Sequence, residues 1–401
     1  MELIRIIWVM CLLSIAQGRE IGFSRFDFKK LSANGNSNLN VMNFGAVGNG
    51  IVDDSKAFLN AWTQMCNGTT GHMTTLIVPQ GRTFLLSPTI FNGPCRVTYP
   101  VVQVDGKIIA PVKGAWNGKP DRWISFTNVY RLTIKGSGQI DGQGSTWWDR
   151  PDEMRPTALT LGYCMGCLLR GLTHLNSPRN HISIFGCREL VVSHVNIIAP
   201  ENSYNTDGID ISRSKGIRVQ DSFIGTGDDC VALGDGSKYI NITNVHCGPG
   251  HGVSIGSLGA NGSEQRVEHV HVRNVHFNGT MNGARIKTWE GGKGYAKRIS
   301  FDGITLENVY NPVIIDQHYF NKRSSQRSAV QISDVVFRGI RGTSTNAVVI
   351  NLNCSEVIPC TNIVLDNIGI RSTKRGAMAS SYCAHVHGAV SKTSPNVPCL
   401  L

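Results

Sequence analysis

Two aspartates and a histidine in the middle of the chain are separated by equal numbers of residues. Asp207 lies in "NTDG", Asp229 in "TGDDC" and His251 in "GPGHGVSIG", and these three positions are equally spaced along the sequence. Asp228 directly precedes Asp229. Hydrolysis of a glycosidic bond needs two carboxyl groups, because one protonates the leaving oxygen while the other activates water. Crowding of like charges raises a pKa, which would keep one of these carboxyls protonated as the acid.

Two cationic residues follow the carboxylates. The string "GARIKTW" places Arg285 and Lys287 at alternate positions, so both side chains lie on one face of a strand. A guanidinium binds a carboxylate through two hydrogen bonds, which suits an acidic substrate. Taken alone, the Asp-Asp pair also fits a calcium loop, and the Arg and Lys also fit a solvated strand face. The regular spacing favours a site that hydrolyses an acidic sugar chain.

The scaffold that would position these residues is a repeat in the second half of the chain. An alternating apolar pattern, followed by a second short apolar strand, recurs roughly every 30 residues, a period typical of solenoids. The copies begin at Leu190, Ile217, Ile240, Val270, Ile299, Val330 and Ile363. Short strands at this period, with Asn and Gly at the corners, predict an all-β parallel β-helix. A sandwich or propeller is the alternative fold, but hairpin signals are scarce. If one coil near the carboxylates takes the interval from Asp207 to Asp229, the site residues form a column.

Upstream, the stretch "DDSKAFLNAWTQM" predicts a helix that covers the first coil of the solenoid. Its apolar residues share one helical face, and Asp53 or Asp54 would be the N-cap. The apolar residues are Ala57, Phe58, Ala61, Trp62 and Met65.

The segment 1–18 has the features of a secretory signal peptide. Arg5 precedes an apolar run from Ile6 to Ala16, and small residues end the segment. We therefore expect a signal peptide at 1–18, an N-terminal extension at 19–40 and one β-helical catalytic domain at 41–401. Removal of the signal leaves eleven of the twelve cysteines, which predicts disulfides and at least one unpaired thiol. Five Asn-x-Ser/Thr sequons fit the same compartment.

The formal net charge of +11 favours an acidic partner. Secretion and the lack of any nucleic-acid-binding motif point to an acidic polysaccharide, not to nucleic acid or membrane. We expect a monomer.

These motifs, with "RIKTW" and "IIDQHY", resemble those of the plant-type polygalacturonases of glycoside hydrolase family 28. The resemblance covers nearly the whole chain from Val41. It implies a right-handed parallel β-helix that hydrolyses de-esterified homogalacturonan of the plant cell wall with inversion. In this family pattern Asp228 is the general acid, Asp207 and Asp229 position and deprotonate water, and His251 tunes the acid. The implied substrate-binding residues are Asn205, Arg285, Lys287 and Tyr319, and no cofactor or metal is expected.

The resemblance also implies disulfides. They are Cys66–Cys95, Cys230–Cys247, Cys354–Cys360 and Cys383–Cys399, with Cys164, Cys167 and Cys187 left over. One departure is Phe320, where relatives often have a cysteine. Other functions stay open: exo instead of endo cleavage, a hydrolase of rhamnogalacturonan or xylogalacturonan, a calcium-dependent pectate lyase, or an inactive wall-binding β-helix.

Overall fold

The computed structural model of the protein describes residues 37–68, 73–119, 121–149, 151, 154–319 and 328–400. All of these belong to one compact unit, Asn36–Leu401. The expected signal peptide and Phe320 lie outside the described residues. No helix within the described ranges has the length and apolar character needed to cross a membrane.

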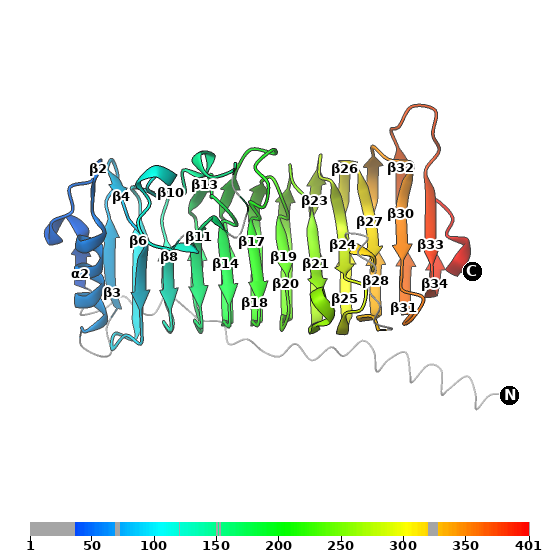
Figure 1. The fold of residues 1–401 in the computed structure, drawn as a ribbon, viewed down its shortest axis with the longest axis horizontal. Coiled ribbons are helices and arrows are strands. Elements are labelled where there is room, and N and C mark those ends of the chain that lie inside the picture. Colours follow the sequence, from blue (N-terminus) through cyan, green and yellow to red (C-terminus); the bar gives the residue numbers. More distant parts are fainter. Residues whose placement is uncertain are drawn as a thin grey trace, which may run out of the picture. The chain divides into compact units, whose positions relative to one another are not determined.

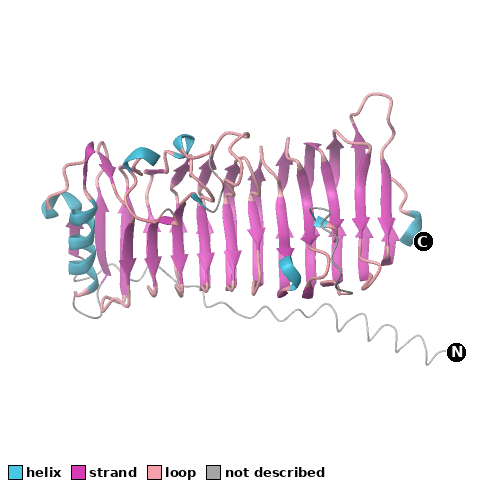
Figure 2. Cartoon of the chain, in the orientation of Figure 1, coloured by secondary structure: helices cyan, strands magenta, loops and turns pink. Residues whose placement is uncertain are grey.

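The described unit is a stack of short parallel strands, with helix α2 beside its first coils and β34 in its last (Figure 1). Helices are few and lie outside the stack (Figure 2). One sheet has 11 strands, each paired with its neighbours in adjacent coils. They are β5 (Thr89–Asn92), β8 (Arg122–Thr127), β11 (Thr157–Gly162), β14 (Ile182–Phe185), β17 (Ile209–Ser212), β19 (Val231–Leu233), β21 (Val253–Leu258), β24 (Asn282–Thr288), β27 (Asn311–Asp316), β30 (Val348–Asn353) and β33 (Ser380–Ala384).

The other sheet has 23 strands and forms the remaining sides of each coil. They are β1 (Ser37–Asn40), β2 (Asn49–Asp53), β3 (Met73–Val78), β4 (Thr83–Leu85), β6 (Tyr99–Val104), β7 (Lys107–Ile109), β9 (Thr133–Lys135), β10 (Gln139–Asp141), β12 (Leu168–Arg170), β13 (Thr173–Leu175), β15 (Arg188–Ser193), β16 (Asn196–Ile198), β18 (Lys215–Gly225), β20 (Lys238–Cys247), β22 (Glu264–Arg273), β23 (His276–Asn278), β25 (Lys293–Asp302), β26 (Thr305–Val309), β28 (Gln331–Arg338), β29 (Arg341–Ser344), β31 (Cys360–Asp366), β32 (Gly369–Ser372) and β34 (Val386–Ser391). The predicted parallel β-helix is confirmed.

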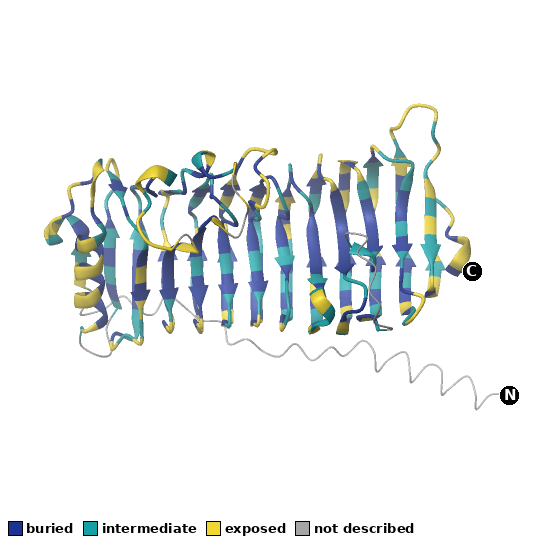
Figure 3. Cartoon of the chain, in the orientation of Figure 1, coloured by how far each residue is buried: buried dark blue, intermediate teal, exposed yellow. Residues whose placement is uncertain are grey.

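The interior of the coils is a continuous apolar core. Figure 3 shows buried residues along the whole stack. Leu190, Ile217, Ile240 and Val270 occupy one register across β15, β18, β20 and β22, and all four are fully buried. No single coil could bury such a row alone, so stacking supplies the core. Truncation of one member, as in Ile240→Ala, would cost about 2–5 kcal/mol.

The predicted repeat is confirmed except in one copy. Ile299 pairs with Val335, not with Val330. Val330 and Ile332, in front of Val335, also alternate with polar residues, so the pattern matches the repeat at a second position. Asp334, with φ 54°, has the left-handed backbone that precedes other copies, such as Tyr239 before Ile240. The coil that begins at Ile299 is therefore longer than predicted, because it contains the segment that includes 320–327.

Helix α2 (Ser55–Cys66) covers the first coils as expected. Its N-cap is Asp54, and its five predicted apolar residues are all buried. The Trp62 ring packs against Phe91 and Phe126, with centroids 5.3 and 5.5 Å apart. The Asp54 side chain accepts hydrogen bonds from the backbone of Val47 and Gly48 and does not cap the helix. Short 3-10 helices occur at η2 (Val41–Phe44), η3 (Lys113–Ala115), η4 (Gly144–Thr146), η6 (Ala260–Gly262) and η8 (Pro398–Leu400).

All four implied disulfides are present. Cys164, Cys167 and Cys187 are unpaired and buried, also as expected. Cys383–Cys399 joins β33 to the C-terminal η8. The thiols lie inside the stack, where burial shields them from solvent reagents.

Candidate active site

The structure places Asp207, Asp229 and His251 at equivalent positions of three successive coils. Strands β17, β19 and β21 pair in register, and each of the three residues lies two positions before the first paired residue of its strand. The turns that lead into the 11-stranded sheet therefore carry the site. The equal spacing in the sequence does form the predicted column.

Tight approach between turns explains the glycines around the column. A Cβ on Gly227 would lie 2.2 Å from the carbonyl oxygen of Ser203 in the preceding coil. At Gly252, with φ +86°, a Cβ would lie 2.1 Å from the carbonyl oxygen of Asn282 in the next coil. Only glycine leaves these backbones close enough for the stack.

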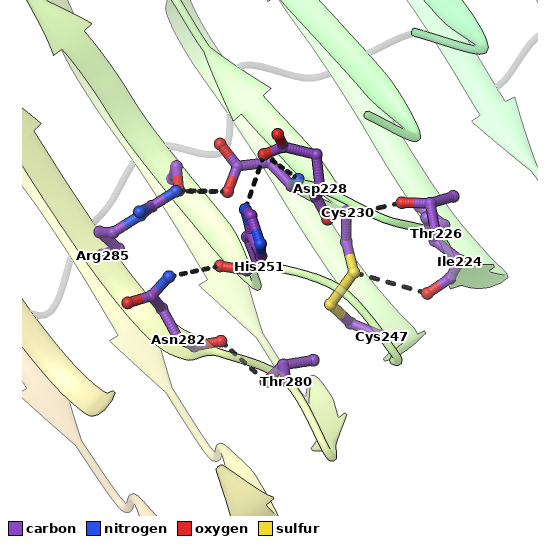
Figure 4. Close-up of a disulfide and its surroundings, with 11 residues drawn as sticks. Ile224, Thr226, Asp228, Cys230, Cys247, His251, Thr280, Asn282 and Arg285 are labelled. Atoms are coloured by element: carbon purple, nitrogen blue, oxygen red, sulfur yellow. Dashed lines mark hydrogen bonds and ion pairs between the residues drawn. A yellow bond between two sulfur atoms is a disulfide. The ribbon is translucent and has the colours of Figure 1, made fainter. Parts of the chain in front are cut away.

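Asp228 and Asp229 are adjacent in sequence but have different surroundings. The Asp228 side chain is 16% exposed, whereas that of Asp229 is 1% exposed. Nδ1 of His251 lies 2.9 Å from Oδ1 of Asp228, and the backbone N–H of Asp229 donates to the same oxygen at 2.8 Å. Figure 4 shows this contact beside the Cys230–Cys247 disulfide, which braces the turn. His251 therefore pairs with Asp228 and not with Asp229, which occupies the equivalent position of the neighbouring coil.

Asp229 lies at the centre of a buried charge cluster. Its Oδ1 accepts from Arg285 at 2.7 Å and from Ser254 Oγ at 2.8 Å, and its Oδ2 accepts from Lys287 at 2.9 Å. Burial alone would raise the pKa of Asp229, but the two cations outweigh it and lower that pKa to about 2. Asp229 is therefore ionised at any working pH.

Strand alternation positions the two cations. Arg285 and Lys287 lie in β24, where period-2 geometry turns both outward from the core toward Asp229. Burial alone would lower the pKa values of both, but the charge of Asp229 raises both pKa values above their ordinary values. Ser254 pairs with Arg285 in register and accepts from its Nε at 2.8 Å. The predicted shared face is confirmed.

Asp207 lies beside a fourth carboxylate, Asp210. Burial and the charges of Asp210, Asp228 and Asp229 raise the pKa of Asp207 well above its ordinary value, although Lys287 offsets part of the effect. Burial and Asp229 likewise raise the pKa of Asp210 to about 7. Four carboxyl groups thus share a small volume, and they do not all ionise together.

The remaining predicted residues lie at the edges of the cluster. Nδ2 of Asn205 is 3.5 Å from Oδ2 of Asp228, and Arg155 donates to Oδ1 of Asn205 at 3.3 Å. Arg155 also donates to the carbonyl of Tyr204 at 2.8 Å, which ties the loop to the scaffold. The Lys287 Nζ lies over the Tyr319 ring, 5.2 Å from its centroid. All eight residues predicted from the sequence therefore lie in one cluster of interacting side chains.

A model of the family described as Glycosyl hydrolases family 28 matches residues 66–394. The chain belongs to this family. A probable polygalacturonase of Arabidopsis thaliana is 47% identical over 387 residues, which covers 95% of this chain and 84% of that protein. Polygalacturonase-2 of Solanum lycopersicum is 37% identical over 375 residues, covering 91% of this chain and 81% of its own.

Solved structures share the fold at lower identity. A hyperthermoactive exopolygalacturonase from Thermotoga maritima gives a TM-score of 0.73 at 20% identity, covering 88% of this chain and 90% of its own. An endo-xylogalacturonan hydrolase from Aspergillus tubingensis gives 0.74 at 23% identity, covering 90% and 97%. The two differ in cleavage mode and substrate according to their names, so the shared fold alone does not decide either property.

The donor set of this family 28 enzyme does not favour a metal ion. Ligand atoms of Asp228, Asp229 and His251 all lie within 4.8 Å of one another. Both oxygens of Asp229, however, already accept from the cationic Arg285 and Lys287. A divalent ion there would meet two positive charges at contact distance, which disfavours its binding.

The motifs did not single out Asp210, Ser254 and Arg155. Asp210 and Ser254 are outward residues of "GIDIS" and "GVSIG", so strand alternation could have indicated them. Only Ala232 separates them in the register ladder, and its small side chain leaves room for Asp229. Nothing in the sequence around Arg155 indicates its contact with the distant loop of Asn205.

Proposed function

We propose that this family 28 glycoside hydrolase cleaves the α-1,4-galacturonosyl linkages of pectic homogalacturonan by direct attack of water, with inversion. The observation that carries the proposal is the difference in surroundings between two adjacent carboxyl groups. Asp228 is partly exposed beside His251, while Asp229 is buried and ionised between two cations. An acid and a fixed anion side by side meet the requirement of glycoside hydrolysis.

Asp228 is the group placed to act as general acid. It donates its proton to the glycosidic oxygen as the bond from that oxygen to the anomeric carbon breaks. Its Oδ1 already contacts His251 and the backbone N–H of Asp229. His251 is therefore in direct contact with the proposed acid.

Asp229 is better placed to orient water than to attack sugar. A retaining mechanism needs a carboxylate oxygen that bonds to the anomeric carbon. Both oxygens of Asp229 accept hydrogen bonds from Ser254, Arg285 or Lys287, and the residue is fully buried. Asp207 is the other member of the proposed water-positioning pair. Its raised pKa makes it a stronger base than Asp229 when it is ionised, and in that form it takes the proton from the attacking water.

Arg285, Lys287, Asn205 and Tyr319 are the proposed substrate contacts. A guanidinium has five N–H donors, so the bonds of Arg285 to Asp229 and Ser254 leave capacity for a galacturonate carboxylate. The names of the curated relatives support galacturonan as the substrate class. The signal-peptide pattern and four disulfides support secretion to a pectin-rich wall.

Incubation with polygalacturonate tests the proposal. Hydrolysis releases reducing ends without an unsaturated, UV-absorbing product, and NMR of the first products shows the inverted anomer. UV absorbance that a chelator abolishes would instead identify a lyase, and retention of the anomer would refute direct attack by water. Monomer as sole product would indicate exo action, whereas a ladder of oligomers would indicate endo action.

A further inference from the structure

A groove adjoins the catalytic turns on the side away from the buried cations. It has a volume of about 770 Å³ and reaches from the loop of Glu201 and Tyr204, past His251, to Thr345. Its other lining residues are Gly227, Gly250, Gly279, Thr280, Met281, Asn308, Tyr310 and Asn311. Backbone hydrogen bonds from Met281 to Gly250 and from Asn311 to Met281 show that consecutive coils form its floor. With coils about 4.8 Å apart, the groove can hold several sugar residues in a row.

Apart from Glu201 and His251, the described residues that line the groove have neutral side chains or are glycine. Tyr204, Met281 and Tyr310 line it with side chains that are 68%, 49% and 49% exposed. None of its twelve described lining residues is Lys or Arg, in a chain that has 39 of them. Glu201 adds a negative charge at one end, and Asp228 lies against His251.

This composition opposes a chain of free galacturonates. Among the described lining residues, a free carboxylate would meet neutral side chains, Glu201 and a histidine that already contacts Asp228, but no Lys or Arg. Desolvation of a charge without a counter-charge is costly. A methyl ester removes that charge and adds a methyl group that packs on Met281 or on the rings of Tyr204 and Tyr310.

We propose that this groove binds methyl-esterified galacturonosyl residues. The inference rests on the proposed function and narrows its substrate. Arg285 and Lys287, on the sheet side of Asp229, take one free carboxylate near the bond that is cleaved. The neighbouring residues of the substrate, in the groove, are esterified. The preferred substrate is thus partially esterified galacturonan and not the fully de-esterified polymer that the sequence resemblance implied.

The test compares galacturonan oligomers of one length, either fully de-esterified or partially methyl-esterified. Wild-type kcat/KM should be about tenfold higher on the esterified oligomer, the effect typical of one methyl group in an apolar pocket. Met281→Lys should reverse that preference by placing a cation in the groove. Met378→Lys is the matched control, because Met378 is 90% exposed and does not line the groove. A preference for the de-esterified oligomer, or a preference that Met281→Lys leaves unchanged, would overturn the inference.

Calorimetric binding of both oligomers to the Asp228→Asn variant separates this inference from the proposed function. Tighter binding of the ester, even if the wild type cleaves neither oligomer, would support the groove assignment and refute the catalytic proposal. Equal or weaker binding of the ester would refute the groove assignment whatever the turnover. A xylose-substituted oligomer that binds tighter than the ester would show that the groove takes a neutral sugar, and the ester assignment would be wrong.

Discussion

Two adjacent aspartates of the active site have opposite surroundings. We call the surroundings of Asp228 the turn side and those of Asp229 the sheet side. On the turn side, Asp228 is partly exposed, contacts His251 and lies next to a groove without cations. On the sheet side, Asp229 is buried against Arg285 and Lys287. Asp228 and Asp229 lie in the turn that precedes β19 (Val231–Leu233). The turn gives the two side chains different surroundings, which separates the proposed proton donor from a buried anion.

The difference shows that burial and neighbouring charges can give two identical side chains different chemical properties. A partly exposed carboxyl can exchange its proton with solvent and substrate between turnovers. A buried carboxylate with two cationic partners keeps its charge and holds its neighbours in place, because removal of any partner leaves a charge unpaired.

The largest expected effect is that of Asp228→Asn on turnover. Loss of the general acid should lower kcat about 10²–10⁴-fold, while oligogalacturonide binding and the melting temperature change little. Kinetics with reducing-end detection, calorimetry and thermal melting measure the three quantities. Asp302→Asn, on the 23-stranded sheet, is a matched control that should keep wild-type turnover. Near-normal kcat in Asp228→Asn would remove this residue from the mechanism.

Asp229→Asn should act on stability as well as on activity. The variant leaves Arg285 and Lys287 buried without their counter-charge, which should reduce the free energy of unfolding by about 3 kcal/mol. Denaturant unfolding at neutral pH measures the loss. Asp228→Asn, which breaks no buried ion pair between oppositely charged side chains, is the comparison. If both variants unfold at the same denaturant concentration, the two sides do not differ as described.

His251→Gln tests the turn side alone. The variant removes the 2.9 Å contact with Asp228. A hydrogen bond to a carboxyl group is worth about 1.5–3 kcal/mol. Loss of that amount from the transition state lowers kcat roughly 10–100-fold. Under the role proposed for His251, its removal should also change the pH profile of kcat. His246→Gln, an exposed position on β20, controls for the substitution. A lower kcat with an unchanged pH profile would indicate a merely structural histidine.

A pH-dependent change in stability is expected for Asp210→Asn. The folded-state pKa of Asp210 is raised from 3.8 to about 7, so the folded protein binds this proton more tightly than the unfolded chain. Its contribution is therefore greatest below about pH 4 and is lost as the pH rises toward about 7. Thermal melting should show equal stability of variant and wild type near pH 4, and a more stable variant near pH 7. A constant difference across that range would contradict the raised pKa.

Asp229 has the opposite effect on the pH dependence of stability, and its effect falls at lower pH. Its pKa is lowered to about 2, so its stabilising contribution is present above its ordinary pKa of 3.8 and is lost as the pH falls toward 2. The wild-type curve should therefore decline on the acid side, and Asp229→Asn should flatten that decline.

Local patterns were sufficient for much of the fold. The alternating strands, the capping helix and the column of Asp207, Asp229 and His251 all follow from periods that can be counted along the chain. The start at Val330 was wrong because an apolar run offers two registers, and only pairing with Ile299 selects Val335.

The recurring chemical groups and their interval could be predicted from the sequence, because the spacing of the strands sets the length of each coil. The contacts between these groups depend on the fold. It paired His251 with Asp228, surrounded Asp229 with two cations from β24 and added Asp210 to the cluster. Side-chain direction and burial depend on the packing of several coils against one another, and no single segment of the chain carries that information.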